Sequence, residues 1–331
     1  MSLTTKQIIA LQSIKGVGIK SILKVGDYSS SFINDENLVN ILEKAKVKKT
    51  QDGAKFSITQ TDVEHALIHA DIVLNECKKQ NIGVISYYDE NFPISLKKAL
   101  NDKGKEAPCI LLYYKGNISL INECSVAIIG SRKSHESANI ASKMIANIFA
   151  NFNVNIVSGL ALGCDTAAHL GALESAKGKT IAILANGLDS VYPKENEKLA
   201  NDILNKGGLL LSEYMMGVNP SKFTFVERDR LQAAISRATI VAQSKVDGGS
   251  MHAALATFYE NKPLYTIKYK DEKLQNSEDF EGNRVLEEKY RAISIGGYTK
   301  TELINKIKSI SEELIKNNTS LDDDLLDDEI F

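Results

Sequence analysis

The sequence of 331 residues predicts an α/β protein with a doubly wound, mostly parallel sheet and a small N-terminal helical domain. From about residue 82 onward, short apolar runs without polar alternation are separated by helical patterns, as in parallel sheets covered on both faces. Before residue 82, apolar residues recur at the spacing of amphipathic helices instead. We therefore expect a helical domain over residues 1–81 and an α/β domain over residues 82–300.

Three helical segments are expected in the N-terminal domain, because their apolar residues recur three or four positions apart. They contain Ile8, Ile9, Leu11, Ile14 and Val17; Leu38, Ile41 and Leu42; and Val63, Ala66, Leu67, Ala70 and Val73. The third set follows Thr61 and Asp62, residue types that often cap helices.

The α/β domain is expected to alternate strands with helices. Strands are predicted at 82–87, 110–114, 126–129, 155–157, 180–184, 209–211, 240–242 and 264–267. Helices are predicted at 137–152, 166–176, 195–206 and 250–259. The polar residues 271–283 predict a loop, and residues 301–331 predict a C-terminal helix over 301–316 followed by an acidic tail.

The net charge is the sum of two unlike parts. The chain has 40 basic and 42 acidic residues, but six of the acids lie in the last eleven residues, where there is no base. The remaining 36 acids leave residues 1–320 with a charge of +4. Such an asymmetry is typical of nucleic-acid-binding proteins and of proteins with interaction tails. The small positive charge of residues 1–320 favours a localised basic groove over a broadly basic surface.

Composition excludes several classes of protein. Apolar residues at 43% and charged residues at 25% are ordinary for a globular protein and exclude collagen-like or wholly disordered chains. No apolar run is long enough for a transmembrane helix, and the N-terminus lacks the features of a secretory signal, so a cytoplasmic protein is expected. Cys77, Cys109, Cys124 and Cys164 form no CxxC pair and are expected to be free core thiols. No metal or cofactor is expected.

Candidate ligand-binding residues follow the strands, because an open parallel sheet binds ligands at the carboxyl ends of its strands. Gly130, Ser131, Arg132 and Lys133 come after the strand at 126–129. A helix N-terminus there offers N–H groups to a phosphate, and Arg132 adds a charge that can bind it in bidentate fashion. An ordinary turn with solvated bases is the alternative.

Three more candidate groups lie in the turns after later strands. They are Ser158, Gly159, Leu160 and Ala161; Asn186 and Gly187; and Gly248, Gly249 and Ser250. Glycine-rich turns before helices suit anions, and several on one sheet edge indicate a ligand with several phosphates. Asp165 and His169 share one helix face and are candidates for orienting the ligand. A capping aspartate and a core histidine are the simpler alternative for these two residues.

A base-plus-aromatic cluster contains Phe225, Arg228 and Arg230. Such clusters suit a phosphate backbone with stacked bases, whereas solvated arginines beside core phenylalanines are the alternative. Signatures of enzymes are absent: there is no P-loop, no GxGxxG after a strand and no HExxH. No carboxylate pair stands out as an acid–base couple, so a protein that is not an enzyme is predicted.

In this order, these residues resemble the DNA processing protein A family (DprA, also called Smf) from about residue 82 to about residue 310. The matching positions are Tyr88, Phe92, Pro93, Leu96, Pro108, Lys115 and Gly116; Gly130 to Arg132; Ser158 to Ala161 with Asp165 and His169; Gly187, Leu188, Asp189, Tyr192 and Pro193; Ser212 and Glu213; Phe225 to Arg230; Gly248 to Ser250; and Gly282, Asn283 and Leu286. The resemblance implies a Rossmann-like core that binds single-stranded DNA through the turn residues named above. It also implies a homodimer that loads a RecA-type recombinase onto DNA during recombination and natural transformation, the uptake of DNA by cells in the state of competence.

The N-terminal domain contains a segment that resembles a helix-hairpin-helix element. Its turn, Gly16-Val17-Gly18, would expose N–H groups to a phosphate, with Lys15 and Lys20 close by. A secondary DNA-binding site is therefore expected there.

The sequence also departs from the family pattern. Asp229 stands where the family has the middle residue of Arg-Asn-Arg, and Gln243 stands where an acid is usual. Cys164 and His252 replace residues that are commonly aliphatic or small, and residues 301–331 are too few for the winged-helix domain of many members.

Two alternative functions share this kind of pocket. One is a nucleotide-binding or nucleoside-monophosphate phosphoribohydrolase-like member of the same superfamily, although the turn around Gly248 lacks that group's proline, third glycine and glutamate. The other is a nucleotide-sensing module.

The tail from Asp322 to Phe331 resembles the acidic tip of single-stranded DNA-binding proteins, which docks partners. The alternatives are a tail that keeps the protein in solution and a tail that covers the basic groove of its own chain.

Overall fold

The computed structural model describes residues 2–27, 33–296 and 299–327, with side chains described as far as residue 317. By its internal contacts the chain divides into two compact units. The first unit is Met1–Lys97 with Pro108–Tyr113, and the second is Lys98–Ala107 with Tyr114–Phe331. The division thus differs from the boundary expected at residue 81, because residues 82–97 belong with the N-terminal helices.

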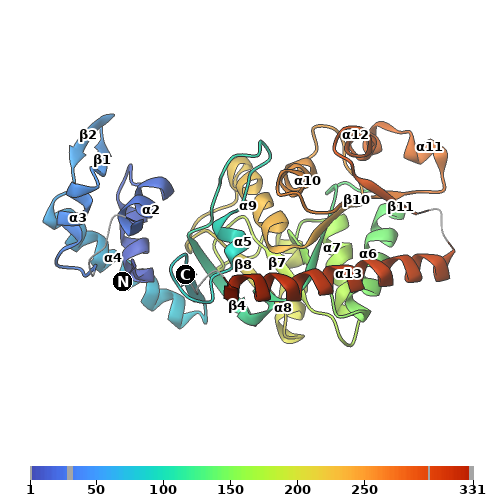
Figure 1. Ribbon diagram of the computed structural model, residues 1–331, viewed down its shortest axis with the longest axis horizontal. Coiled ribbons are helices and arrows are strands. Elements are labelled where there is room, and N and C mark those ends of the chain that lie inside the picture. The colour runs from blue at the N-terminus through green and yellow to red at the C-terminus, as the bar shows by residue number, and fades with distance from the viewer. Residues whose placement is uncertain (1, 28–32, 297–298, 328–331) are drawn as a thin grey trace. The chain divides into compact units, whose positions relative to one another are not determined.

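The first unit is mainly helical, as its apolar spacing predicted. Its helices are α1 (Thr5–Ser13), α2 (Ile19–Asp27), α3 (Leu38–Lys44), α4 (Gln60–Lys79) and the short α5 (Ile94–Lys97), drawn in blue to cyan in Figure 1. The cap of α4 is Thr59, two residues before the predicted position. Thr59 Oγ1 accepts the Asp62 N–H, and the Asp62 carboxylate accepts the Thr59 N–H. Hydrogen bonds from Lys49 and Thr59 lower the pKa of Asp62 to about 2.

A hairpin in the first unit was not predicted. Its strands, β1 (Lys48–Gln51) and β2 (Ala54–Ser57), pair antiparallel around Asp52 and Gly53. Both turn residues have positive φ, 47° and 79°, which is the geometry that an Asp-Gly hairpin turn adopts. Both strands are largely exposed, so no apolar alternation marked them in the sequence.

The second unit contains the parallel sheet that the sequence predicted. Along the sheet the strands run β11 (Ile293–Gly296), β10 (Leu264–Lys268), β9 (Ala238–Val241), β5 (Ser125–Ile129), β6 (Asn155–Ser158), β7 (Thr180–Ile183), β8 (Leu209–Ser212) and β4 (Leu111–Gly116). All pairings from β11 to β8 are parallel. The chain crosses between the units inside β4, and β3 (Gly83–Ser86) lies beside β4. Strand β11 was not predicted; it is a short edge strand, and Ile293 is exposed.

The order of the strands reverses between β5 and β9. From β5 the chain builds the sheet outward through β6, β7 and β8, and it then returns to the other side of β5 to add β9, β10 and β11. Connections on the two sides of this point therefore cover opposite faces, which leaves a crevice at the carboxyl ends of β5 and β9. The backbone closes this point through a hydrogen bond of 2.9 Å from Ser131 N–H to Gln243 O.

Helices cover both faces of this sheet (Figure 1). On one face lie α6 (Glu136–Asn151), α7 (Cys164–Leu173) and α13 (Lys300–Asp327), and on the other lie α9 (Lys222–Ile235) and α10 (Ser250–Tyr259). The remaining elements are α8 (Glu197–Asn205), α11 (Glu272–Gln275), α12 (Glu281–Lys289), and the 3-10 turns η1 (Ile118–Asn122), η2 (Lys194–Asn196) and η3 (Glu278–Phe280). Residues 271–283, predicted as a loop, thus contain helical turns, and Phe280 is buried.

Apolar side chains from the strands meet those of α6, α7 and α13 in one core. Leu303, Ile307, Ile310 and Leu314 recur three or four residues apart and bury one stripe of α13 against it. The helix is longer than the predicted 301–316 and includes Asp322 to Asp327, whereas Asp328 to Phe331 lie outside the described residues. The four cysteines are free and buried, as predicted. No helix in the described ranges is long and apolar enough to cross a membrane.

Candidate functional site

The turn after β5 is accessible. Gly130 and Ser131 are half-buried, and Arg132 and Lys133 are exposed. The helix α6 starts only at Glu136, and His135 caps it by accepting the Ser137 N–H at Nδ1, 3.2 Å away. The predicted anion contact at this helix N-terminus is therefore partly replaced by a histidine cap. The side chains of the turn that face solvent are the bases Arg132 and Lys133.

Arg132 lies on an aromatic ring. Its guanidinium carbon is 4.1 Å from the centroid of Phe225, which comes from the first turn of α9. The ring of Tyr192, from the loop after β7, lies 5.8 Å from that of Phe225 at an interplanar angle of 48°. Tyr192 is 46% exposed and Phe225 is half-buried. We call Arg132, Phe225 and Tyr192 the stacked cluster; three connections that are far apart in sequence build it.

The turn after β9 is the other accessible candidate. Gly248 and Ser250 are half-buried and Gly249 is exposed. Helix α10 has no side-chain cap at its N-cap residue, Gly249, and Ser250 Oγ donates to Ser244 Oγ at 2.8 Å. Because β9 is the neighbour of β5, this turn and Gly130 to Lys133 lie on the two sides of the topological switch point.

The turn after β6 does not present its N–H groups to solvent. Ser158, Gly159, Leu160 and Ala161 are all buried. The Asp165 carboxylate accepts the N–H groups of Gly159 and Ala161 at 3.1 and 3.4 Å. The predicted phosphate cradle is thus filled by a carboxylate of the same chain. Burial raises the pKa of Asp165 to about 6, although the nearby Arg228 opposes this rise.

His169 has a different partner from Asp165. Its Nδ1 lies 2.7 Å from Thr180 Oγ1, whose own proton goes to Ile156 O at 2.8 Å, so Nδ1 must be the donor. His169 Nε2 is buried without a hydrogen-bond partner among the described residues. Burial, and then the charge of Arg228, lowers the pKa of His169 to about 3. This side chain is the core histidine of the simpler alternative.

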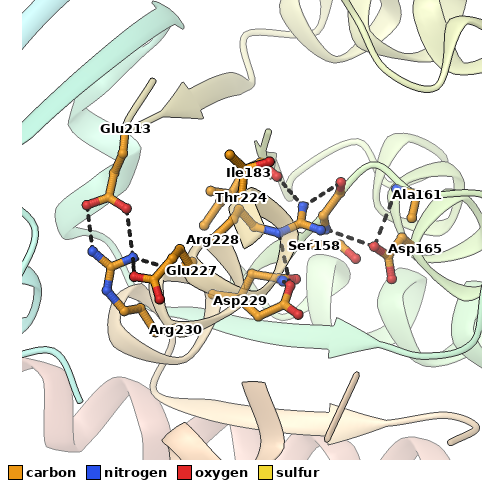
Figure 2. Close-up of polar contacts among 12 residues, drawn as sticks. Ser158, Ala161, Asp165, Ile183, Glu213, Thr224, Glu227, Arg228, Asp229 and Arg230 are labelled. Carbon is orange, nitrogen blue, oxygen red and sulfur yellow. Dashed lines mark hydrogen bonds and ion pairs between the residues drawn. The ribbon is translucent and has the colours of Figure 1, made fainter. Parts of the chain in front are cut away.

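Arg228 is buried, with 4% of its surface exposed. Its Nη1 donates to Gly159 O at 2.7 Å and to Ile183 O, and its Nε donates to Asp229 at 3.0 Å (Figure 2). A β-carbon on Gly159 would collide with this guanidinium, so glycine is required there. Arg228 therefore ties the ends of β6 and β7 to α9. The phosphate contact predicted for it is replaced by these internal hydrogen bonds.

Arg230 is also buried and binds Glu213, the residue after β8. Two parallel hydrogen bonds of 2.7 Å join its Nη1 and Nη2 to the Glu213 carboxylate (Figure 2). Its Nε donates to Ala107 O at 2.7 Å. Such bidentate pairs fix both position and orientation. The predicted contact of Arg230 with a ligand is replaced by this internal pair, a partnership that no spacing in the sequence indicated.

Asp229 and the turn after β7 are internal as well. Asp229 Oδ1 accepts hydrogen bonds from Arg228 Nε at 3.0 Å and from Gln232 Nε2 at 2.8 Å. Burial raises its pKa, with the charge of Arg228 acting in the opposite sense. Asn186 and Gly187 are buried, and Asn186 Nδ2 donates to Ser190 O at 2.9 Å. These residues shape the loop that carries Tyr192.

The predicted secondary site lies in the first unit. Lys15, Gly16 and Gly18 are exposed in the connection from α1 to α2, and Lys20 is exposed in the first turn of α2. Thr50 N–H donates to Lys15 O at 2.7 Å, which fixes this connection against the hairpin. A groove of about 530 Å³ adjoins it and is also lined by Lys49, His65 and His69.

We expect Glu213→Gln to destabilise the protein by about 3 kcal/mol, because Arg230 would keep a buried charge without its main counter-ion. Denaturant unfolding measures this loss. The exposed pair of Lys198 and Asp202 provides the control: Lys198→Ala should cost about 0.5 kcal/mol or less. A loss below about 1 kcal/mol for Glu213→Gln would contradict the structural role of the pair.

We also expect the buried His169 to destabilise the protein in acid. Its pKa falls from 6.5 to about 3 on folding, so only the unfolded chain takes up this proton between those values. The contribution of the neutral His169 to the free energy of unfolding is fully present above pH 6.5 and decreases by up to about 1.4 kcal/mol per pH unit below it. His169→Gln removes the group, so the unfolding free energy of the parent minus that of the variant should fall as the pH drops from 7 to 4.5. A difference that does not change with pH would contradict this assignment.

Comparison with known proteins agrees with this geometry. The model of the family DNA recombination-mediator protein A matches residues 83–306. The DNA processing protein DprA of Streptococcus pneumoniae is 33% identical over 268 residues, which are 81% of this chain and 88% of that protein. Its X-ray structure covers 89% of this chain and 95% of its own, at a TM-score of 0.68 and 28% identity.

A second solved structure, of DNA processing protein A from Helicobacter pylori, concerns that protein's single-stranded DNA binding mode. It covers 68% of this chain and 95% of its own, at a TM-score of 0.57 and 30% identity. The family match spans more than half of the chain, and the parallel sheet has the predicted Rossmann-like form. The chain therefore belongs to the DNA recombination-mediator protein A family, the DprA/Smf proteins.

Proposed function

We propose that this protein binds single-stranded DNA at the switch point between β5 and β9 and acts in recombination as a non-catalytic mediator. The stacked cluster is the observation that carries the proposal. It places a guanidinium and two aromatic rings, one of them 46% exposed, at the sheet edge where a parallel sheet binds its ligands. Family membership and the Helicobacter pylori relative's single-stranded DNA binding mode support it.

Stacking favours a single strand over a duplex. Bases of a single strand can place their faces on aromatic side chains, and each such contact is worth about 1–3 kcal/mol. In a duplex, the same faces are already stacked on neighbouring base pairs.

The phosphate contacts are assigned to the accessible residues only. We propose that Arg132, Lys133 and the turn Gly248 to Ser250 contact the backbone, with Gly130 and Ser131 forming the floor of the site. Arg228 and Arg230 hold the site together from below, because their charges are already bound by backbone carbonyls and carboxylates. The effect of replacing them on DNA binding would therefore be indirect.

The absence of catalysis is likewise a proposal. The buried acids of the sheet edge, Asp165 and Asp229, are bound to N–H groups and to Arg228, which leaves neither placed as a general base. The alternative ligand, a mononucleotide, shares the phosphate contacts but offers one base instead of several. Competition between AMP and an oligonucleotide distinguishes the two, since AMP should displace the strand only at a large excess.

Further parts of the chain are assigned to partners. We propose residues 1–81 as a helix-hairpin-helix domain with a secondary DNA contact at Lys15 and Lys20, and a homodimer that delivers DNA to a RecA-type recombinase. The acidic segment from Asp322 to Phe331 is proposed to dock a protein partner or to compete with DNA for the basic site. These assignments rest on family membership and on charge.

Arg132→Ala and Phe225→Ala should each weaken binding of an oligo-dT strand by roughly tenfold or more, since one loses a phosphate contact and both disrupt the stacked cluster. Titration with salt separates the two effects. The slope of log affinity against log salt should fall by about 0.7 for Arg132→Ala and stay unchanged for Phe225→Ala.

The matched control is Lys198→Ala, which removes an equal charge from the surface of α8 and should leave binding unchanged. Arg132→Lys keeps the charge and weakens stacking, so it should retain the salt slope. Unchanged affinity of Arg132→Ala for oligo-dT would rule out the proposed site.

Deletion of residues 321–331 tests whether the tail competes with DNA. If it does, the deletion should tighten binding of oligo-dT several-fold at low salt, because six acids no longer occupy or repel the basic site. The gain should disappear at high salt. Equal affinity of the two proteins at low salt would exclude competition and leave the partner-docking proposal.

A further inference from the structure

A histidine and an aspartate pair at the start of α10. His252 is the third residue of the helix, and its Nδ1 lies 2.7 Å from Asp102 Oδ2 in the segment before β4. The His252 side chain is 33% exposed and that of Asp102 is 19% exposed. Nε2 lies on the opposite side of the ring from Nδ1, and within the described residues the hydrogen bond to Asp102 is the one that the His252 ring makes.

This pair lies at the switch point. Helix α10 follows β9, the neighbour of β5, and His252 comes two residues after Ser250 in the turn assigned to the phosphate backbone. Its charge also reaches Asp229: burial raises the pKa of that acid, and the charges of Arg228, His252 and Arg132 oppose the rise. His252 and Arg132 thus act on the same buried carboxylate from the two sides of the crevice.

We propose that His252 is a phosphate-contacting residue of this site, that Asp102 positions its ring, and that its protonation adds one contact to the bound strand. The inference rests on the proposed binding of single-stranded DNA. With Asp102 accepting from Nδ1–H, a neutral ring has an unprotonated Nε2, which cannot donate to a phosphate. A protonated ring keeps the bond to Asp102 and gains an Nε2–H donor with a positive charge.

The charges around the ring favour this role. Asp102 forms a hydrogen bond with His252. The second acid, Asp229, interacts with the charges of His252 and of the two bases Arg132 and Arg228. Arg228 is bound to Asp229, so the charge of Arg132 is the main attraction for a phosphate on the other side of the crevice. Acidification adds the charge of His252 to it. The added charge should strengthen DNA binding, and a comparison of pH 8 with pH 6 measures this gain.

The test measures the salt dependence of oligo-dT binding to the full chain at pH 6 and pH 8. In the parent protein, the slope of log affinity against log salt should be steeper at pH 6 by about 0.7, the value for one more phosphate contact with a single strand. Affinity at low salt should be roughly tenfold higher at pH 6. His252→Gln, which does not titrate, should give the same slope at both pH values.

Two variants separate His252 from its neighbours. His135→Asn keeps an acceptor for the cap of α6 and removes the other exposed histidine near the turn after β5, so it should retain the pH effect. Asp102→Asn should keep the affinity at pH 8 and lose most of the gain at pH 6, an effect that a purely structural role of Asp102 would not produce.

The outcomes distinguish this inference from the function on which it depends. Binding of oligo-dT with one slope at both pH values would overturn the role of His252 and leave the proposed function standing. Retention of the pH effect in His252→Gln, or its loss in His135→Asn, would also overturn it. Failure to bind oligo-dT at either pH would refute the proposed function itself.

Discussion

The buried charge of Arg228 is the constraint on which the ligand-binding edge depends. A guanidinium away from water must have its donors bound, and here carbonyl oxygens from Gly159 and Ile183 and the carboxylate of Asp229 bind them. These partners come from the ends of β6 and β7 and from α9. One side chain thus fixes three connections, requires glycine at position 159, and holds α9 so that Phe225 on its first turn meets Arg132.

Carboxylates of the chain itself occupy much of the sheet edge that looked suited to anions. The Asp165 carboxylate accepts hydrogen bonds from N–H groups of the turn after β6, and the Glu213 carboxylate accepts from Nη1 and Nη2 of Arg230. The accessible part of this edge is the turns after β5 and β9, where Arg132, Lys133 and the uncapped start of α10 are not covered by internal partners of this kind. A localised site of this kind agrees with the small positive excess on residues 1–320.

Local patterns in the sequence were sufficient for the sheet and for most helices. Buried strands such as β5 and β7 are continuous apolar runs, and helices such as α6 carry an apolar stripe, so each could be recognised from its own residues. Features with weak apolar patterns were missed: the exposed hairpin of β1 and β2, the edge strand β11 and the turns within 271–283. The cap of α4 was placed two residues late because Thr59 and Thr61 are both acceptable capping types.

By itself, the sequence determined the parallel sheet, the family, and the turns that reach its carboxyl edge, because periodicity and residue order are local properties. Only the tertiary structure decided which of those turn residues face solvent. Arg132, Arg228 and Arg230 are equally plausible phosphate ligands in the sequence, yet Arg132 is exposed above the ring of Phe225 while the other two are buried on internal acceptors. Burial and partnership depend on residues such as Glu213, Gly159 and Asp102, which are distant in the chain and meet only when the strands are ordered in the sheet.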